Sequence, residues 1–208
     1  MTNYDHFAET FSKSRKNLSW PELDYIISDI HDQGYTNLLD IGCGNGRFLE
    51  EMGKRGMKLE TYLGIDSSKG MIEEARRLHP EYRFEVCDML SLDTFEVWTY
   101  DAIIFLASFH HLETLEERIQ VLHDVKKLLA PGGRVYMTNW NLRDQEKYTK
   151  SHRWDGDYDI KIGEYSRYYH GFMISELEEL FAQTGYSVVE NRVWEGGRNI
   201  VSVIKNIW

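Results

Sequence analysis

The segment from Asp40 to Gly46, with the sequence DIGCGNG, places one acidic residue before three glycines that are each two positions apart. Glycine has no side chain, so a chain built this way turns sharply and lets a ligand lie against its backbone. A second carboxylate, Asp66, follows after another short apolar run. A carboxylate at that place accepts hydrogen bonds from the hydroxyls of a ribose. The spacing therefore predicts a strand, a glycine turn, a helix and a second strand that together bind a nucleoside.

The charge of the same segment indicates which nucleoside it binds. A dinucleotide fingerprint reads G-x-G-x-x-G and holds a pyrophosphate at the helix N-terminus. This chain reads G-x-G-x-G and carries Arg47 where the last glycine of that fingerprint would fall. The Asp40 carboxylate before the loop would repel a pyrophosphate and attract a cation. S-adenosylmethionine (SAM) has a ribose, an ammonium group and a sulfonium but no phosphate, so the sequence favours SAM over NAD.

The composition of the whole chain limits the class of protein. Its 208 residues, of which 42% are hydrophobic and 28% charged, predict one globular α/β domain over residues 1–208. Within it, we expect residues 1–34 to form an N-terminal lid and helix, and residues 139–172 to form an insert on the substrate side. The formal net charge of −10 argues against binding of nucleic acid by bulk electrostatics.

Signals for export, cross-linking or metal binding are weak. No apolar run reaches the length of a membrane-spanning helix, and residues 1–16 lack the apolar core of a signal peptide. Cys43 and Cys87 are too few for a disulfide framework. His110 and His111 are adjacent, so their side chains point apart, and no ligand cluster accompanies them. We therefore expect a cytoplasmic protein without membrane contact and without a bound metal.

Apolar patterns of strand and helix type alternate along the chain. Helices are expected after four N-cap candidates and after the glycine loop; the candidates are Ser19, Ser67, Thr114 and Ser175. Strands are expected at 37–41, 61–65, 82–86, 102–106, 134–138, 187–193 and 200–204. This order predicts a Rossmann-like, doubly wound sheet of seven strands, five parallel plus a C-terminal antiparallel hairpin, with helices on both faces. Residues 139–172 show little periodicity, and we expect an irregular segment at the carboxyl ends of the strands.

Taken together, these features resemble the class I SAM-dependent methyltransferases over nearly the whole chain. The resemblance is carried by Asp40 to Gly46, Gly64-Ile65-Asp66, Cys87-Asp88 and Pro131-Gly132-Gly133. It implies a set of cofactor-binding residues, with Asp66 on the ribose, Asp88 on the adenine amino group and Met89 on the adenine ring. The full set is Tyr4, Arg15, Asp40, Gly42, Gly44, Asn45, Gly46, Asp66, Ser67, Met71, Asp88, Met89, Leu106 and Ser108.

Four further segments are similar to the tRNA methyltransferases that esterify 5-carboxymethyluridine at the wobble position. They are Tyr4-x3-Ala8-x2-Phe11-x3-Arg15, Trp20-Pro21, Ser108-Phe109-His110-His111-Leu112 and Arg167-Tyr168-Tyr169-His170. This resemblance implies methyl transfer to a carboxylate on a tRNA base, and a small zinc-binding activator subunit as a possible partner. It also places Tyr4 and Arg15 in a lid over the cofactor.

Methyl transfer from a sulfonium is an in-line displacement, in which alignment supplies most of the acceleration. A carboxylate acceptor is already ionised at pH 7 and needs only to be held, which suits Arg167. Tyr168 and His170 would add hydrogen bonds or stacking. An amine or phenol acceptor would need a base, for which His110, His111 and His170 are the candidates. The expected catalytic residues are thus Arg167, Tyr168, His170 and His111, and the alternatives are a methyltransferase of small metabolites and an inactive SAM-fold scaffold.

Overall fold

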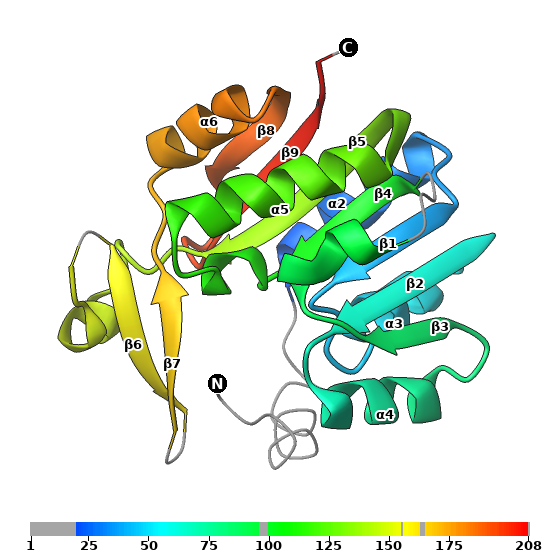
Figure 1. Ribbon diagram of the computed structural model, residues 1–208, viewed down its shortest axis with the longest axis horizontal. Coiled ribbons are helices and arrows are strands. Elements are labelled where there is room, and N and C mark those ends of the chain that lie inside the picture. The colour runs from blue at the N-terminus through cyan, green and yellow to red at the C-terminus, as the bar shows by residue number, and fades with distance from the viewer. Residues whose placement is uncertain (1–19, 96–99, 155, 163–164, 208) are drawn as a thin grey trace.

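The computed structural model describes residues 20–95, 100–154, 156–162 and 165–207. Its main sheet has seven strands in the order β3-β2-β1-β4-β5-β9-β8 (Figure 1). The strands are β1 (Asn37–Ile41), β2 (Thr61–Asp66), β3 (Arg83–Val86), β4 (Tyr100–Leu106), β5 (Leu129–Trp140), β8 (Tyr186–Val193) and β9 (Asn199–Asn206). Strands β1 to β5 pair in parallel, and β9 pairs antiparallel with both β5 and β8. The predicted sheet, with its five parallel strands and C-terminal hairpin, is confirmed.

Helices cover both faces of this sheet. They are α2 (Pro21–Asp32), α3 (Arg47–Lys54), α4 (Lys69–Leu78), α5 (Leu115–Leu128) and α6 (Ile174–Gln183). In Figure 1, α5 and α6 lie in front of the sheet and α2 and α3 lie behind it. Two buried clusters fill these layers: Leu38 packs in the cluster of α2, α3 and α4, and Leu39 packs in that of α5 and α6. Consecutive leucines are buried on opposite faces because a central parallel strand is covered on both sides. No helix in the described ranges is long and apolar enough to cross a membrane.

Helix starts agree with the sequence at one N-cap and differ at two others. Thr114 and Glu117 form the predicted capping box of α5. Helix α4 is capped by Ser68 instead of Ser67. The Asp66 carboxylate accepts a hydrogen bond from the Ser68 N–H at 2.8 Å, so the chain turns at Ser68 and the helix begins one residue later than expected. Helix α6 has Met173 at its N-cap position, not Ser175, and the Glu176 carboxylate accepts from the Met173 N–H at 3.3 Å. The fourth candidate, Ser19, lies outside the described residues.

The segment 139–172 is more regular than expected, and the prediction of an irregular insert was wrong. After β5 it contains a 3-10 helix, η4 (Glu146–Ser151), and a separate two-stranded antiparallel sheet of β6 (Asp157–Ile162) and β7 (Tyr165–His170). Residues 157–162 alternate charged with aromatic or aliphatic residues, which is the pattern of a half-buried strand, and this local signal was missed. Tyr158, Ile160 and Tyr169 bury their side chains with Leu142 in a small cluster of their own. In Figure 1 this hairpin stands apart from β2 and β3.

Candidate functional site

A cavity of about 460 Å³ lies at the carboxyl ends of the parallel strands. Thirteen of the residues expected to bind or act lie in its wall. They are Asp40, Gly42, Gly44, Asn45, Asp66, Ser67, Met71, Asp88, Met89, Leu106, Ser108, His111 and Arg167. Gly46, Tyr168 and His170 are not part of that wall. Tyr4 and Arg15 lie outside the described residues.

The three glycines of the loop have left-handed φ angles but serve different purposes. At Gly42, φ is +76° and an added Cβ would collide with Ser108. At Gly44, φ is +55° and no protein atom lies within 4 Å of the place that a Cβ would take. Gly46 faces the His79 and Phe84 rings instead of the cavity. The backbone at Gly44 is therefore the part of the loop that a ligand approaches, and Gly42 and Gly46 allow close packing within the fold.

Asp40 is the fourth residue of β1, between the buried Leu39 and Ile41, and is 1% exposed. Its Oδ2 accepts a hydrogen bond from the Tyr62 hydroxyl at 2.7 Å, while its Oδ1 is buried with no hydrogen-bond partner in the described structure. Burial raises the pKa of Asp40 to about 7, against the lowering effect of the Tyr62 hydrogen bond, and the charge of Asp66 raises it further. An unpaired carboxylate oxygen in a cavity wall fits a positively charged ligand group, such as the ammonium of SAM.

The two other acids at this end of the cavity also order the backbone. Asp66 accepts from the Gly44 N–H at 3.0 Å and from the Ser68 N–H at 2.8 Å, so it fixes the glycine loop to the start of α4. Burial raises the pKa of Asp66, and these two N–H groups oppose the shift. Asp88 caps the 3-10 helix η2 (Met89–Thr94) by accepting from the Leu90 N–H at 3.0 Å. Each carboxylate retains lone pairs that a ribose or an amino group would use.

Strand β7 divides the Arg167–His170 stretch between two environments, because successive side chains of a strand face opposite sides. Arg167 and Tyr169 lie in the cavity wall. Burial lowers the pKa of Arg167 to about 10, partly offset by Tyr169, so its guanidinium stays charged at neutral pH. The Tyr169 ring stacks on Trp140, with centroids 4.9 Å apart and planes at 16°. Tyr168 and His170 face the other side of the strand.

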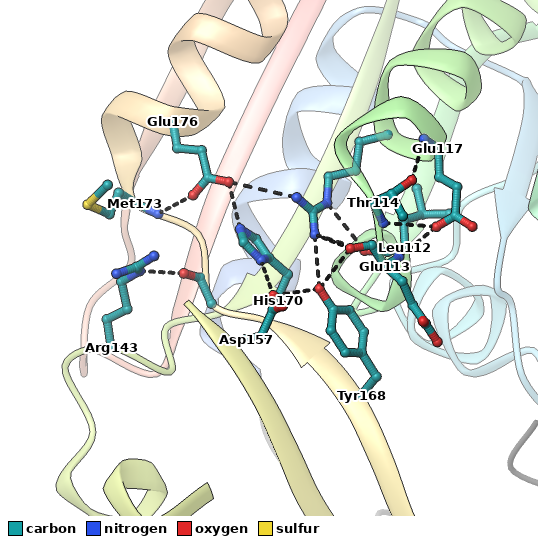
Figure 2. Close-up of polar contacts among 12 residues, drawn as sticks. Leu112, Glu113, Thr114, Glu117, Arg143, Asp157, Tyr168, His170, Met173 and Glu176 are labelled. Atoms are coloured by element: carbon teal, nitrogen blue, oxygen red, sulfur yellow. Dashed lines mark hydrogen bonds and ion pairs between the residues drawn. The ribbon is translucent and has the colours of Figure 1, made fainter. Parts of the chain in front are cut away.

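On that side a polar network holds the hairpin against α5 and α6 (Figure 2). The Tyr168 hydroxyl donates to Asp157 at 2.6 Å and accepts from Arg118 of α5 at 3.1 Å. The His170 ring nitrogens contact Asp157 at 2.8 Å and Glu176 of α6 at 2.6 Å. The structure therefore does not bring Tyr168 and His170 to the cavity beside Arg167. Both residues anchor β7, which holds Arg167 and Tyr169 in place.

His111 belongs to the 3-10 helix η3 (Phe109–His111) and lines the cavity as expected. Its Nδ1 lies 3.0 Å from the Tyr168 carbonyl oxygen. Burial lowers the pKa of His111 to about 4, although that backbone hydrogen bond raises it. A histidine with such a pKa is neutral at pH 7 and is a weak general base.

The cavity wall also contains residues to which the sequence assigned no role in the site, among them Trp20, Cys43 and Trp140. Cys43 and Trp140 follow or end parallel strands, so their place at the carboxyl end of the sheet was the available signal. Ala107 has φ +54°, the one positive φ among the described residues other than glycine. Trp20 packs under the Arg47 guanidinium, 4.5 Å from the ring centroid.

Comparison with known proteins supports this interpretation of the cavity. A family model described as a methyltransferase domain matches residues 38–133. A tRNA (carboxymethyluridine(34)-5-O)-methyltransferase from Xenopus tropicalis is 33% identical over 151 residues, which cover 71% of this chain and 22% of that protein. The protein of the same name from Saccharomyces cerevisiae is 34% identical over 140 residues, which cover 67% of this chain and 47% of that protein. The chain thus spans about a fifth to about half the length of these two relatives.

Solved structures share the fold. An S-adenosylmethionine-dependent methyltransferase from Clostridium acetobutylicum matches with a TM-score of 0.75 at 14% identity, covering 98% of each chain. A SAM-bound amino pentose methyltransferase from Micromonospora echinaspora matches with a TM-score of 0.70 at 20% identity, covering 95% of this chain and 96% of that one. The domain match spans the glycine loop and the acids of the cavity. Residues 38–133 thus match a methyltransferase domain, and the fold of the chain is that of SAM-dependent methyltransferases of known structure.

Proposed function

We propose that this chain transfers the methyl group of SAM to the carboxylate of 5-carboxymethyluridine in tRNA. The cofactor supplies an electrophilic methyl group on its sulfonium. Asp40 and Asp66 would hold the ammonium and the ribose, and the backbone at Gly44 would lie against the nucleoside. Met89 and Leu106 supply apolar surface in the same wall. The acids favour a cation and so orient the cofactor, while the acceptor is held by other residues.

One observation carries the choice of acceptor: the cavity wall holds a partly buried, charged guanidinium, and the two adjacent histidines in that wall, His110 and His111, are poor bases. Arg167 remains charged, whereas burial lowers the pKa of His111 to about 4 and that of His110 well below its usual value. A carboxylate needs no base, because it is ionised at pH 7. Arg167 pairs with it through parallel N–H donors and turns one oxygen toward the methyl group. An amine acceptor would lack the base that it requires.

The relatives named above support the tRNA substrate, since two of them carry the name of a methyltransferase of carboxymethyluridine at position 34 of tRNA. A small-metabolite substrate is the second candidate, which the net charge of −10 favours. An inactive scaffold is disfavoured by the unpaired Asp40 oxygen, which a partner-binding surface alone would leave unexplained.

The test is methyl transfer to total tRNA that contains or lacks 5-carboxymethyluridine, compared between the wild type and Arg167→Ala. Loss of a charged hydrogen-bonded pair costs about 1.5–3 kcal/mol, or roughly a 10- to 150-fold decrease in kcat/KM. Arg167→Lys keeps the positive charge but lacks the paired donors, so its kcat/KM should lie between that of the wild type and that of Arg167→Ala. Both forms are assayed with and without a small zinc-binding partner subunit. Equal labelling of the two tRNA samples would contradict the tRNA substrate, and no binding of SAM in calorimetry would leave the scaffold.

A further inference from the structure

His110, like its neighbour, is held in one tautomer by the backbone. Asn141 donates its N–H to Arg198 of the β9 side, so the N–H of Trp140 faces the opposite edge of β5. Strand β4 has already ended at Leu106 and offers no carbonyl oxygen there. The His110 Nδ1 accepts the hydrogen bond instead, 3.2 Å from the Trp140 nitrogen. A ring nitrogen that accepts carries no proton, so the proton of neutral His110 is on Nε2.

This Nε2–H group has no partner. The His110 side chain is 0% exposed and lies in the cavity wall, and no hydrogen-bond acceptor meets its Nε2 in the described structure. Burial lowers the pKa of His110 well below its usual value, and the neighbouring His111 and His170 lower it further. A backbone interaction with Ala107 opposes these shifts without reversing them, so the ring is neutral at pH 7. A buried donor left unpaired costs about 1–3 kcal/mol. Such a group in a binding cavity is a donor for a ligand.

His111 has the opposite tautomer. A carbonyl oxygen only accepts, so the His111 Nδ1, which lies 3.0 Å from the Tyr168 oxygen, must carry the proton. The lone pair of His111 is therefore on Nε2. The side chains do not point apart, as the sequence led us to expect: the two histidine rings lie 4.5 Å apart at 89°, and both face the Tyr169 ring at 4.5 to 5.1 Å. One end of the cavity thus offers a fixed donor beside a fixed acceptor.

We propose that His110 and His111 form a donor–acceptor pair that recognises the imide edge of a uracil ring. The Nε2–H of His110 would donate to the C4 carbonyl, and the Nε2 of His111 would accept from N3–H. Cytosine presents the reverse order, an amino donor at C4 and an acceptor at N3, and would leave both histidines mismatched. This inference rests on the proposed function, in which Arg167 holds the carboxylate of the same base.

A pair of amide variants separates recognition from a structural role of His110. The oxygen of His110→Asn reaches the position of Nδ1 and keeps the Trp140 hydrogen bond, but it loses the donor at Nε2. The amide nitrogen of His110→Gln reaches the position of Nε2 and keeps that donor, but it loses the backbone acceptor. We expect His110→Asn to lower kcat/KM for RNA by about tenfold or more and His110→Gln to recover most of it. The reverse ranking, with SAM affinity unchanged in both, would show a structural role only and overturn the proposal.

Selectivity for the ring is measured on anticodon stem-loop RNA carrying 5-carboxymethyluridine or 5-carboxymethylcytidine. The proposal expects the wild type to prefer the uridine by about 100-fold or more, since two buried groups become unpaired with the cytidine. Equal methylation of both RNAs would overturn the proposal and leave the proposed function intact. Methylation of neither RNA by SAM-bound protein would reject the proposed function itself. Nitrogen-15 NMR at pH 7 tests the tautomers without substrate, and the same tautomer on both histidines would contradict the pairing.

Discussion

At the scale of single residues, the carboxyl of Asp40 is the group whose charge should change when the cofactor binds. Burial raises the pKa of Asp40 to about 7, so a large share of the unliganded protein carries the proton at pH 6.5. A bound ammonium stabilises the ionised form, and SAM binding should therefore release a proton. Calorimetry at pH 6.5 in buffers of different ionisation enthalpy measures that proton. Asp40→Asn keeps an oxygen for the Tyr62 hydroxyl and should release none.

The same pKa predicts how stability depends on pH. A carboxyl whose pKa in the folded protein lies above that in the unfolded chain contributes stability below the unfolded value, near pH 4, and loses it as the pH rises through about 7. We therefore compare the Tm of the unliganded wild type with that of Asp40→Asn at the same pH. The difference, wild type minus variant, should be lower at pH 8 than at pH 6. Parallel pH profiles of Tm in the two proteins would show that Asp40 is ionised throughout.

Two neighbouring glycines offer a matched test of what the loop does. In Gly44→Ala the new Cβ meets no protein atom, so the fold should tolerate it at the cost of a left-handed alanine, about 1–2 kcal/mol, while SAM binding is lost. In Gly42→Ala the new Cβ collides with Ser108, so the fold itself should lose stability. Thermal unfolding with SAM titration separates the two effects. Equal losses of stability in both variants would contradict a ligand-facing role for Gly44.

At the scale of elements, the β6–β7 hairpin shows what the sequence predicts and what it does not. The sequence singled out the stretch around Arg167 as a whole, but alternation along a strand sends Arg167 and Tyr169 to the cavity and Tyr168 and His170 to the anchor. Without the strand assignment, four consecutive polar and aromatic residues give no way to choose between faces. The Thr114 cap was predictable because a capping box is purely local. The cap at Ser68 was missed because it depends on Asp66.

The anchor should position the acceptor without affecting the cofactor. Asp157 accepts from Tyr168 and contacts His170, so Asp157→Asn weakens the attachment of β6 and β7. We expect faster hydrogen exchange in both strands and a higher KM for RNA, with an unchanged Kd for SAM. Asp159→Asn is the control, because Asp159 on the same strand pairs at the surface with Arg153. The same loss of SAM affinity in both variants would contradict separate holding of the two substrates.

Acid should loosen the wild-type anchor in the same way. Burial alone would raise the pKa of Asp157 and of Glu176. Contacts with Tyr168 and His170 lower the pKa of Asp157, and the contact with His170 lowers that of Glu176. Carboxyls with depressed pKa values stabilise the fold above the unfolded value, near pH 4, and this contribution is lost as the pH falls through their folded values. Hydrogen exchange of β7 at pH 3.5 and pH 6 should therefore differ more in the wild type than in Asp157→Asn.

At the scale of the whole molecule, the sheet was predictable because its strands are short apolar runs separated by helices, a pattern set by burial on both faces. The shape of the cavity was not, because its wall joins β1, β4 and β5 to β7, and such long-range contacts leave no local pattern. Trp140 illustrates this limit: it ends β5, and only the fold brings it against Tyr169 of the hairpin.

The charge of the molecule gives the last prediction, since a protein with net charge −10 must bind RNA through few local cations. Helix η4 supplies candidates beside the cavity. Lys147 lies over the Tyr148 ring at 4.6 Å, and Tyr148 stacks on Trp140 of the cavity wall at 6.1 Å. Lys150 is exposed on the same helix. RNA that reaches the cavity past η4 would place its phosphates near these two ammonium groups.

The double variant Lys147→Glu, Lys150→Glu should therefore lower kcat/KM for tRNA and make it less sensitive to salt. Each phosphate of single-stranded RNA that a lysine no longer neutralises reduces the slope of log affinity against log salt by about 0.7, so two such phosphates reduce it by about 1.4. Methylation of the free nucleoside should not change, because it needs the cavity alone. The control is the double variant Lys58→Glu, Lys205→Glu, which alters two other exposed lysines and changes the net charge by the same amount. If that control lowered tRNA methylation as much, the effect would be bulk repulsion and η4 would not be the RNA-binding element.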